Sequence, residues 1–293
     1  MLGGHASVAG VHSYNKDQSQ RPTEGKKKKK RKEKRETSPT TIAMAPPSGI
    51  IVPLYIYPLS PTTWAPLYDS ISAYPNLHFV VIVNPNSGPG SSPAPDANYA
   101  REVARLNSYA NVDTVGYIAI RYCKKPLQEV LEEIQTYATW AHDYVRTGLG
   151  VGGIFLDETP NHYSSEAAEY LAILQASIKS TPGFLAHRLV IHNPGTPPDA
   201  ALANPEPDLI LTCEEPYSRY RSNEVQRRLR QLHYDRTRCG YVIHSVPIHH
   251  LRPLVLELRY RAAYLFVTEL FGEFYERFGP NSWTVFIEAL QPT

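Results

Sequence analysis

Eight short apolar runs, separated by longer stretches, restrict the folds open to this chain more than any other feature of its sequence. The runs lie at residues 50–57, 77–83, 115–121, 151–156, 189–192, 209–212, 241–244 and 262–267. Most are continuous rather than alternating, which is typical of parallel strands covered on both faces. Amphipathic stretches with apolar residues at helical spacing lie between several of them, at residues 98–109, 127–147, 165–180 and 223–233. The sequence therefore predicts strands and helices in alternation.

This alternation predicts a single α/β domain, a (β/α)8 TIM-type barrel, over residues 48–293. Eight strand–helix units over about 245 residues match the usual size of such a barrel, about 250 residues. A doubly wound open sheet is the alternative. The first run is not followed by a GxGxxG segment, which weighs against that alternative.

Residues 1–47 differ sharply from the rest of the chain. They contain 11 Lys and Arg against 4 Asp and Glu, whereas the remainder contains 19 against 24. Almost no large apolar residues interrupt the tail, so we expect it to be a disordered polybasic segment. The basic run at 26–35 is either a nuclear address or a solvated tail without a specific partner. Because the remaining chain is mildly acidic, we expect no nucleic-acid binding by the folded domain.

The sequence also bears on the compartment and on metal binding. No apolar run approaches the roughly 20 residues that span a membrane, and the N-terminus lacks the apolar core of a signal peptide. Cys123, Cys213 and Cys239 match neither a zinc pattern nor a CxxC motif. The chain as written therefore predicts an intracellular monomer without a metal or cofactor. A different natural N-terminus would instead predict a secreted or cell-surface protein.

Polar and aromatic residues follow nearly every predicted strand, where the loops of a barrel build its active site. The chain also contains 20 Tyr, whose flat rings and hydroxyls suit polar, ring-shaped ligands. His192 and His244 are each either a ligand contact or a hydrogen-bonded core histidine. The candidate substrate-binding residues are Tyr55, Tyr57, Asn84, Tyr122, His192, Asn193, Tyr217, His244 and Thr268.

Three carboxylates are the candidate catalytic residues. Asp157 and Glu158 follow the fourth apolar run, and Glu214 follows the sixth. An acid at the end of a buried strand lies in a partly dry site, where its pKa can shift. Glycoside hydrolysis needs two such acids facing one pocket. The alternative is that these acids cap loops or pair with Arg, and neighbours such as Glu158 and Glu215 can face away, since successive strand residues point oppositely.

Several segments in one order make the chain resemble the spherulin-4 (spherulation-specific) family over roughly residues 48–290. They are VPLYIYP at 52–58, NPNSGPG at 84–90, VGYI at 115–118, GGIFLDE at 152–158, NPG at 193–195, Glu214, and VT at 267–268. The resemblance implies a (β/α)8 glycoside hydrolase that acts on N-acetylgalactosamine- or galactosamine-containing polysaccharide without a cofactor. It implies that Asp157 and Glu214 form the central pair and that Glu158 supports them.

Two functions stay open at this point. The first is an endo-acting, retaining hydrolase of an amino-sugar polymer, in which Asp157 is the nucleophile or orients a 2-acetamido group and Glu214 is the acid/base. The second is a non-catalytic spherulation- or stress-associated protein, structural or carbohydrate-binding, on the same barrel. The carboxylates favour the first, and the basic tail without an export signal favours the second.

Overall fold

Eight parallel strands close into a barrel in the computed structural model, which describes residues 46–185, 187–202 and 204–291. Each strand pairs with the next along the chain, and β8 pairs with β1. The strands are β1 Gly49–Leu54, β2 Phe79–Val83, β3 Val112–Ala119, β4 Gly153–Asp157, β5 Leu189–Asn193, β6 Leu209–Pro216, β7 Cys239–His244 and β8 Tyr264–Val267. The predicted (β/α)8 barrel is confirmed, and the open sheet is excluded.

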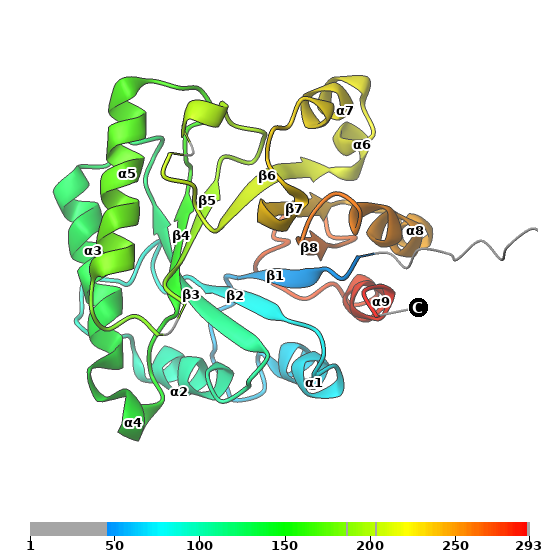
Figure 1. Ribbon diagram of the computed structural model, residues 1–293. Helices are drawn as coiled ribbons and strands as arrows, with labels where there is room; N and C mark the ends of the chain where they lie inside the picture. Colours follow the sequence, from blue (N-terminus) through cyan, green and yellow to red (C-terminus); the bar gives the residue numbers. More distant parts are fainter. Residues whose placement is uncertain (1–45, 186, 203, 292–293) are drawn as a thin grey trace, which may run out of the picture. The chain divides into compact units, whose positions relative to one another are not determined.

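Helices connect the strands and lie outside the barrel (Figure 1). The helices of two or more turns are α1 Ala65–Ala73, α2 Ala97–Leu106, α3 Leu127–Thr139, α5 Ser165–Ser180, α7 Asn223–Arg230, α8 Ile248–Leu258 and α9 Ser282–Ala289. Short helices are η1 Trp140–Asp143, α4 Tyr144–Thr147, η2 Ala200–Leu202, α6 Tyr217–Tyr220 and η3 Arg236–Arg238. Among the described residues, none of these helices has both the length and the apolarity needed to cross a lipid bilayer.

The single helix predicted at residues 127–147 is divided into α3, η1 and α4. The change comes at Trp140, whose side chain is buried and packs edge-to-face on Tyr137 at 4.8 Å. The chain tightens there into a 3-10 turn, and α4 ends at Gly148 in the left-handed conformation (φ 67°), as is common at helix ends.

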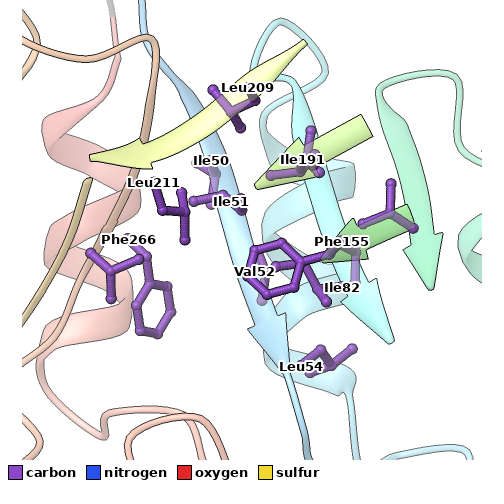
Figure 2. Packing of buried hydrophobic residues seen from close by; sticks show 14 of the residues in the cluster. Ile50, Ile51, Val52, Leu54, Ile82, Phe155, Ile191, Leu209, Leu211 and Phe266 are labelled. Carbon is purple, nitrogen blue, oxygen red and sulfur yellow. The ribbon is translucent and has the colours of Figure 1, made fainter. Parts of the chain in front are cut away.

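The barrel interior is filled by apolar side chains from the strands (Figure 2). Phe155, Ile191 and Leu209 lie side by side, because Phe155 pairs in register with Ile191 and Ile191 with Leu209. Successive residues of a strand point to opposite faces, so the residues two positions further along share this inward face. On β4 and β5 these are Asp157 and Asn193, the last residues of their strands. The packed core thus positions polar side chains at the barrel mouth.

Hydrogen bonds fix the residues that come just before β1. The predicted tail 1–47 falls outside the described residues except for Pro46 and Pro47. Their carbonyls accept hydrogen bonds from Arg259 Nε at 3.3 Å and from an Arg236 guanidinium nitrogen at 2.6 Å. Ser48 Oγ donates to the Ala262 carbonyl at 2.9 Å. These bonds hold the chain where it enters β1.

Candidate functional site

A cleft of about 300 Å³ opens where strands β4 to β7 end. Its lining residues are Tyr122, Asp157, Glu158, Asn193, Pro194, Gly195, Glu214 and His244. All three predicted catalytic carboxylates lie in it, together with three of the predicted substrate-binding residues. The cleft stands at the carboxyl end of a parallel barrel, the end at which enzymes of this fold carry their sites.

Asp157 is held by three hydrogen-bond donors. Tyr117 donates its hydroxyl to Oδ2 at 2.6 Å, and the Asn193 side chain donates to Oδ1 at 2.8 Å. The backbone N–H of Glu158 also donates to Oδ1, at 2.8 Å. An ionised carboxylate accepts at both oxygens and donates at neither. The site therefore fits Asp157 as an anion with a fixed orientation.

Glu214 reaches the same cleft because β6 contains a bulge. The pairing of β6 with β7 shifts register between Leu211 and Cys213. Leu211 packs in the barrel core (Figure 2), so a regular strand would turn Cys213 inward and Glu214 outward. One extra residue reverses that alternation. The bulge thus selects Glu214 as the inward-facing acid of β6.

Two donors bind Glu214, one at each carboxylate oxygen. Tyr275 donates its hydroxyl to Oε1 at 2.6 Å, and Asn193 donates to Oε2 at 2.9 Å. Burial raises the pKa of Glu214, and the nearby charge of Asp157 raises it further, while the two donors oppose the shift. The Glu214 carboxyl group therefore holds its proton to a higher pH than usual.

A single amide joins the two acids. Asn193 Nδ2 donates to both Asp157 and Glu214, and Asn193 Oδ1 accepts from the backbone N–H of Gly195 at 3.0 Å. The Gly195 carbonyl accepts from the Glu214 backbone N–H at 2.9 Å. Gly195 makes both contacts in the left-handed conformation (φ 66°), which glycine adopts without steric cost. Because the two bonded carboxylate oxygens lie 2.8 Å and 2.9 Å from the same nitrogen, they are less than about 6 Å apart.

Three tyrosines pack in a row beside the acids, with Tyr55 in the middle. Tyr55 packs edge-to-face against Tyr117 at 5.4 Å and against Tyr275 at 5.2 Å. Burial raises the pKa of all three phenols. They therefore stay protonated, and Tyr117 and Tyr275 keep donating to the carboxylates. Tyr55 was predicted as a site residue, and it acts through these two neighbours rather than by lining the cleft.

Left-handed backbone conformations gather on the rim of the cleft. Arg121, Tyr122 and Cys123 are consecutive with φ of 52°, 55° and 63°, and Glu158 and Ser245 both have φ of 55°. Such a conformation costs a residue with a Cβ on the order of 1 kcal/mol or more, and residues strained in this way cluster at functional sites. The turn after β3 leaves the Tyr122 ring 58% exposed, at the opening of the cleft.

His244 forms the opposite wall of the cleft. Its ring stacks on Phe274 with centroids 4.2 Å apart and planes 8° apart, and its Nδ1 lies 2.9 Å from Ser245 Oγ. Burial lowers the pKa of His244. The residue therefore presents a neutral imidazole to the cleft at physiological pH.

The predicted ligand role of His192 does not agree with its position. Its side chain is buried, lies on the outer face of β5, and lines a small apolar space with Leu171, Leu202 and Ile210. Burial lowers its pKa to about 4. Because Asn193 points into the cleft, strand alternation turns His192 away from it. His192 is a core histidine, but it is not the hydrogen-bonded one that the sequence left open, because its buried Nε2 has no hydrogen-bond partner in the described part of the chain.

Four other predicted substrate-binding residues are turned to structural contacts outside the cleft lining. The Tyr57 hydroxyl accepts a hydrogen bond from the Asn98 side chain of α2 at 2.9 Å. The backbone carbonyl of Asn84 accepts one from the Tyr99 hydroxyl at 3.0 Å. Tyr217 stacks on His250 at 5.5 Å. Thr268 is buried and its hydroxyl lies 3.2 Å from that of Ser282, which joins the end of β8 to α9.

Glu215 also faces away, as the alternation of strand residues predicts. Its two carboxylate oxygens bind Arg228 at 3.2 Å and Arg219 at 3.1 Å. Glu158 behaves differently from Glu215, since it lines the cleft beside Asp157. Its left-handed backbone at the end of β4 breaks the alternation that would have turned it outward.

Sequence reasoning missed Tyr117 and Tyr275 as site residues. Tyr117 lies mid-strand on β3, not at a strand end, and only its pairing opposite Phe155 of β4 shows that it shares the inward face. Tyr275 comes from the long segment between β8 and α9, which carries no periodic pattern. Its backbone carbonyl accepts from the Tyr55 backbone N–H at 3.0 Å, a contact that only the folded chain reveals.

Comparison with known proteins gives matches in sequence and in structure. The model of the family described as spherulation-specific family 4 matches residues 49–290. Spherulin-4 of Physarum polycephalum is 36% identical over 163 residues, which are 54% of this chain and 42% of that protein. The match thus spans less than half the length of that curated relative.

Two solved structures share the barrel. The crystal structure of Aspergillus clavatus Sph3 in complex with GalNAc has a TM-score of 0.80 and 38% identity, covering 84% of this chain and 98% of that one. A chitinase from Bacteroides thetaiotaomicron has a TM-score of 0.50 and 10% identity, covering 83% and 95%. At that identity the second likeness concerns the fold alone.

Proposed function

The chain belongs to spherulation-specific family 4, and from this premise we propose that it is a retaining glycoside hydrolase that cleaves within N-acetylgalactosamine-containing polysaccharide. The observation that carries the proposal is the joining of Asp157 and Glu214 by the amide of Asn193 at the barrel mouth. The GalNAc bound to the 38% identical relative supports the choice of sugar.

Glu214 is the general acid and base of this reaction. Burial raises its pKa, so it holds a proton that it can give to the leaving glycosidic oxygen. The Tyr275 hydroxyl at 2.6 Å fixes the direction of its carboxyl group. Once the first half of the reaction has removed that proton, the resulting carboxylate takes a proton from water.

Asp157 is the nucleophile. Its carboxylate attacks the anomeric carbon while Glu214 protonates the leaving oxygen, and a covalent glycosyl ester forms. Water, deprotonated by Glu214, then attacks the same carbon and releases Asp157. Retaining enzymes hold their two carboxyl groups about 5–5.5 Å apart, and the shared amide of Asn193 supports that spacing.

The remaining cleft residues suit sugar binding. The exposed ring of Tyr122 offers a flat apolar face to a pyranose, and His244 offers a neutral imidazole nitrogen. Glu158 supplies a third carboxylate beside Asp157, and it accepts hydrogen bonds from sugar hydroxyl groups. Its left-handed backbone at the end of β4 places it in the lining of the cleft.

The proposal is tested by incubating the protein with polymers of N-acetylgalactosamine, galactosamine and N-acetylglucosamine. We expect new reducing ends from the first polymer, and proton NMR of the earliest products should show the same anomer as the cleaved linkage. Products of the opposite anomer would exclude a retaining mechanism. Binding of the polymers without any cleavage would replace the hydrolase with a non-catalytic carbohydrate-binding protein.

The pH dependence of the reaction follows from the contact between Tyr275 and Glu214. A general acid works only while protonated, so kcat/KM falls as the pH rises through the pKa of Glu214. The Tyr275 hydroxyl lowers that pKa. We expect Tyr275→Phe to move the alkaline limb of the kcat/KM profile upward by about one pH unit, since a hydrogen bond to a charged group contributes about 1.5–3 kcal/mol and one unit corresponds to about 1.4 kcal/mol.

A matched control is Tyr260→Phe, because Tyr260 is 59% exposed and follows α8 on the outside of the barrel. Its profile should coincide with that of the wild type. An alkaline limb that stays in place or moves to lower pH in Tyr275→Phe would contradict the role given to Glu214.

A further inference from the structure

A second and larger hollow, of about 520 Å³, lies beside the catalytic cleft. Its walls include His162, Thr196, Asp199, Arg228, Gln231 and His233. We refer to this hollow as the outer groove. None of these residues was singled out as a binding candidate from the sequence, and none is used in the reaction described above.

The outer groove and the cleft are built from the same two loops. The loop after β4 lines the cleft with residues 157–158 and the outer groove with residues 161–162. The loop after β5 lines the cleft with residues 193–195 and the outer groove with residues 196–200. Each loop thus runs from one hollow to the other, so a polymer that lies across these two loops reaches both hollows.

The third wall, formed at α7, is tied to the strand that carries Glu214. One Arg228 guanidinium nitrogen donates to Thr196 Oγ1 at 3.1 Å, and another donates to Glu215 at 3.2 Å. Glu215 is the residue next to Glu214 on β6. The helix, the β5 loop and the catalytic strand are therefore joined through one guanidinium group.

Hydrogen bonds within the protein hold together the two loops that line the outer groove. The Asp199 backbone N–H donates to the Asn161 carbonyl at 2.9 Å, and the Tyr163 backbone N–H donates to Asp199 Oδ2 at 2.9 Å. These bonds join the β4 loop to the β5 loop. A site that is ordered before binding loses less entropy when a ligand enters it.

The side chains of the outer groove suit an uncharged, hydroxyl-rich chain. His162, Gln231 and His233 offer exposed donors and acceptors, and the adjacent Pro197 and Pro198 offer flat apolar faces. The charges are close to balance, because Arg228 is paired with Glu215 and Asp199 lies 3.8 Å from His162. A polyanion would find no unpaired cluster of positive charge there.

We propose that the outer groove binds the sugar units that follow the cleaved bond along the polymer, which makes the protein selective for long chains. This inference rests on the proposed function. Among the other hollows of comparable size in the described part of the chain, the one at Gln135 and His142 is lined by α3, η1 and the segment after α5, none of which reaches the cleft. The outer groove alone continues the path of a substrate that passes Asp157 and Glu214.

The test compares chain lengths. N-acetylgalactosamine oligomers of increasing length are given to the wild type and to the Gln231→Ala/His233→Ala variant. We expect kcat/KM of the wild type to rise with length, and the variant to lose about tenfold on the longest oligomers, since each lost hydrogen bond weakens binding by about 0.5–1.5 kcal/mol. The loss should shrink steadily as the oligomers shorten.

The matched control is Gln135→Ala, which removes an exposed glutamine from the unconnected hollow and should leave the length dependence unchanged. Binding of the same oligomers to Glu214→Gln, with and without the two groove substitutions, is measured by calorimetry. A loss that is equal at all lengths, or absent, overturns the outer groove while hydrolysis by the wild type stands. Groove-dependent binding without hydrolysis supports the outer groove and overturns the hydrolase. Absence of both overturns both.

Discussion

Asp157→Asn is expected to reduce hydrolysis of the amino-sugar polymer by on the order of 10⁴-fold or more, the scale of loss when an attacking side chain is removed. The amide is almost the same size as the carboxylate but carries no charge and does not form the glycosyl ester. Its oxygen still accepts one of the hydrogen bonds that Tyr117 and Asn193 donate to Asp157. The folded barrel should therefore persist, which a thermal melt followed by circular dichroism checks.

Azide separates the two chemical roles open to Asp157. In Asp157→Ala, azide occupies the vacated space and attacks the anomeric carbon in place of the carboxylate. We expect partial recovery of activity and a glycosyl azide whose anomer is opposite to that of the substrate. If the wild type retains the anomer but azide does not restore activity to Asp157→Ala, the 2-acetamido group of the sugar is the attacking group and Asp157 only orients it. Full activity in Asp157→Asn would refute the site itself.

Glu214→Gln is expected to lower kcat by about 10²- to 10⁴-fold, the usual contribution of a general acid–base group. The neutral amide does not transfer a proton to the leaving oxygen. The remaining activity should lose its alkaline limb, because the raised pKa of Glu214 sets that limb. Substrates with a nitrophenyl leaving group, which needs little protonation, should lose much less in the first step.

Glu215→Gln provides the matched control on the same strand. Glu215 follows Glu214 directly, but its carboxylate is paired with Arg219 and Arg228 outside the cleft. We expect its kcat on short oligomers to exceed that of Glu214→Gln by at least about 10²-fold. Equal losses in the two variants would show that the fold of β6, rather than the acid in the cleft, is what the substitutions disturb.

Much of the architecture could be predicted because it depends on local patterns. Apolar runs, most of them continuous, marked all eight strands, and the alternation with helices led to the barrel. A barrel gathers the ends of its strands at one rim, so Asp157 and Glu214 could be paired although 57 positions separate them in the numbering. The same reasoning placed Tyr122, Asn193 and His244 at the cleft.

The sequence was not sufficient to determine which strand residues face into the barrel. His192 and Asn193 are adjacent and both polar, and the sequence does not say which of them faces inward. The pairing of Asn193 with Asp157 across β4 and β5 decides it. On β6 the bulge between Leu211 and Cys213 reverses the alternation. No residue in that run predicts a bulge.

The sequence by itself determined the number and order of the strands, the barrel, and the acids at its mouth, since these follow from local periodicity and from the ends of apolar runs. Only the tertiary structure decided which side chains donate hydrogen bonds to those acids. Tyr117, Asn193 and Tyr275 come from three distant segments and bind the carboxylates through their side chains. Such contacts depend on strand register and on the path of a loop, both of which are set by pairing between residues far apart in the chain.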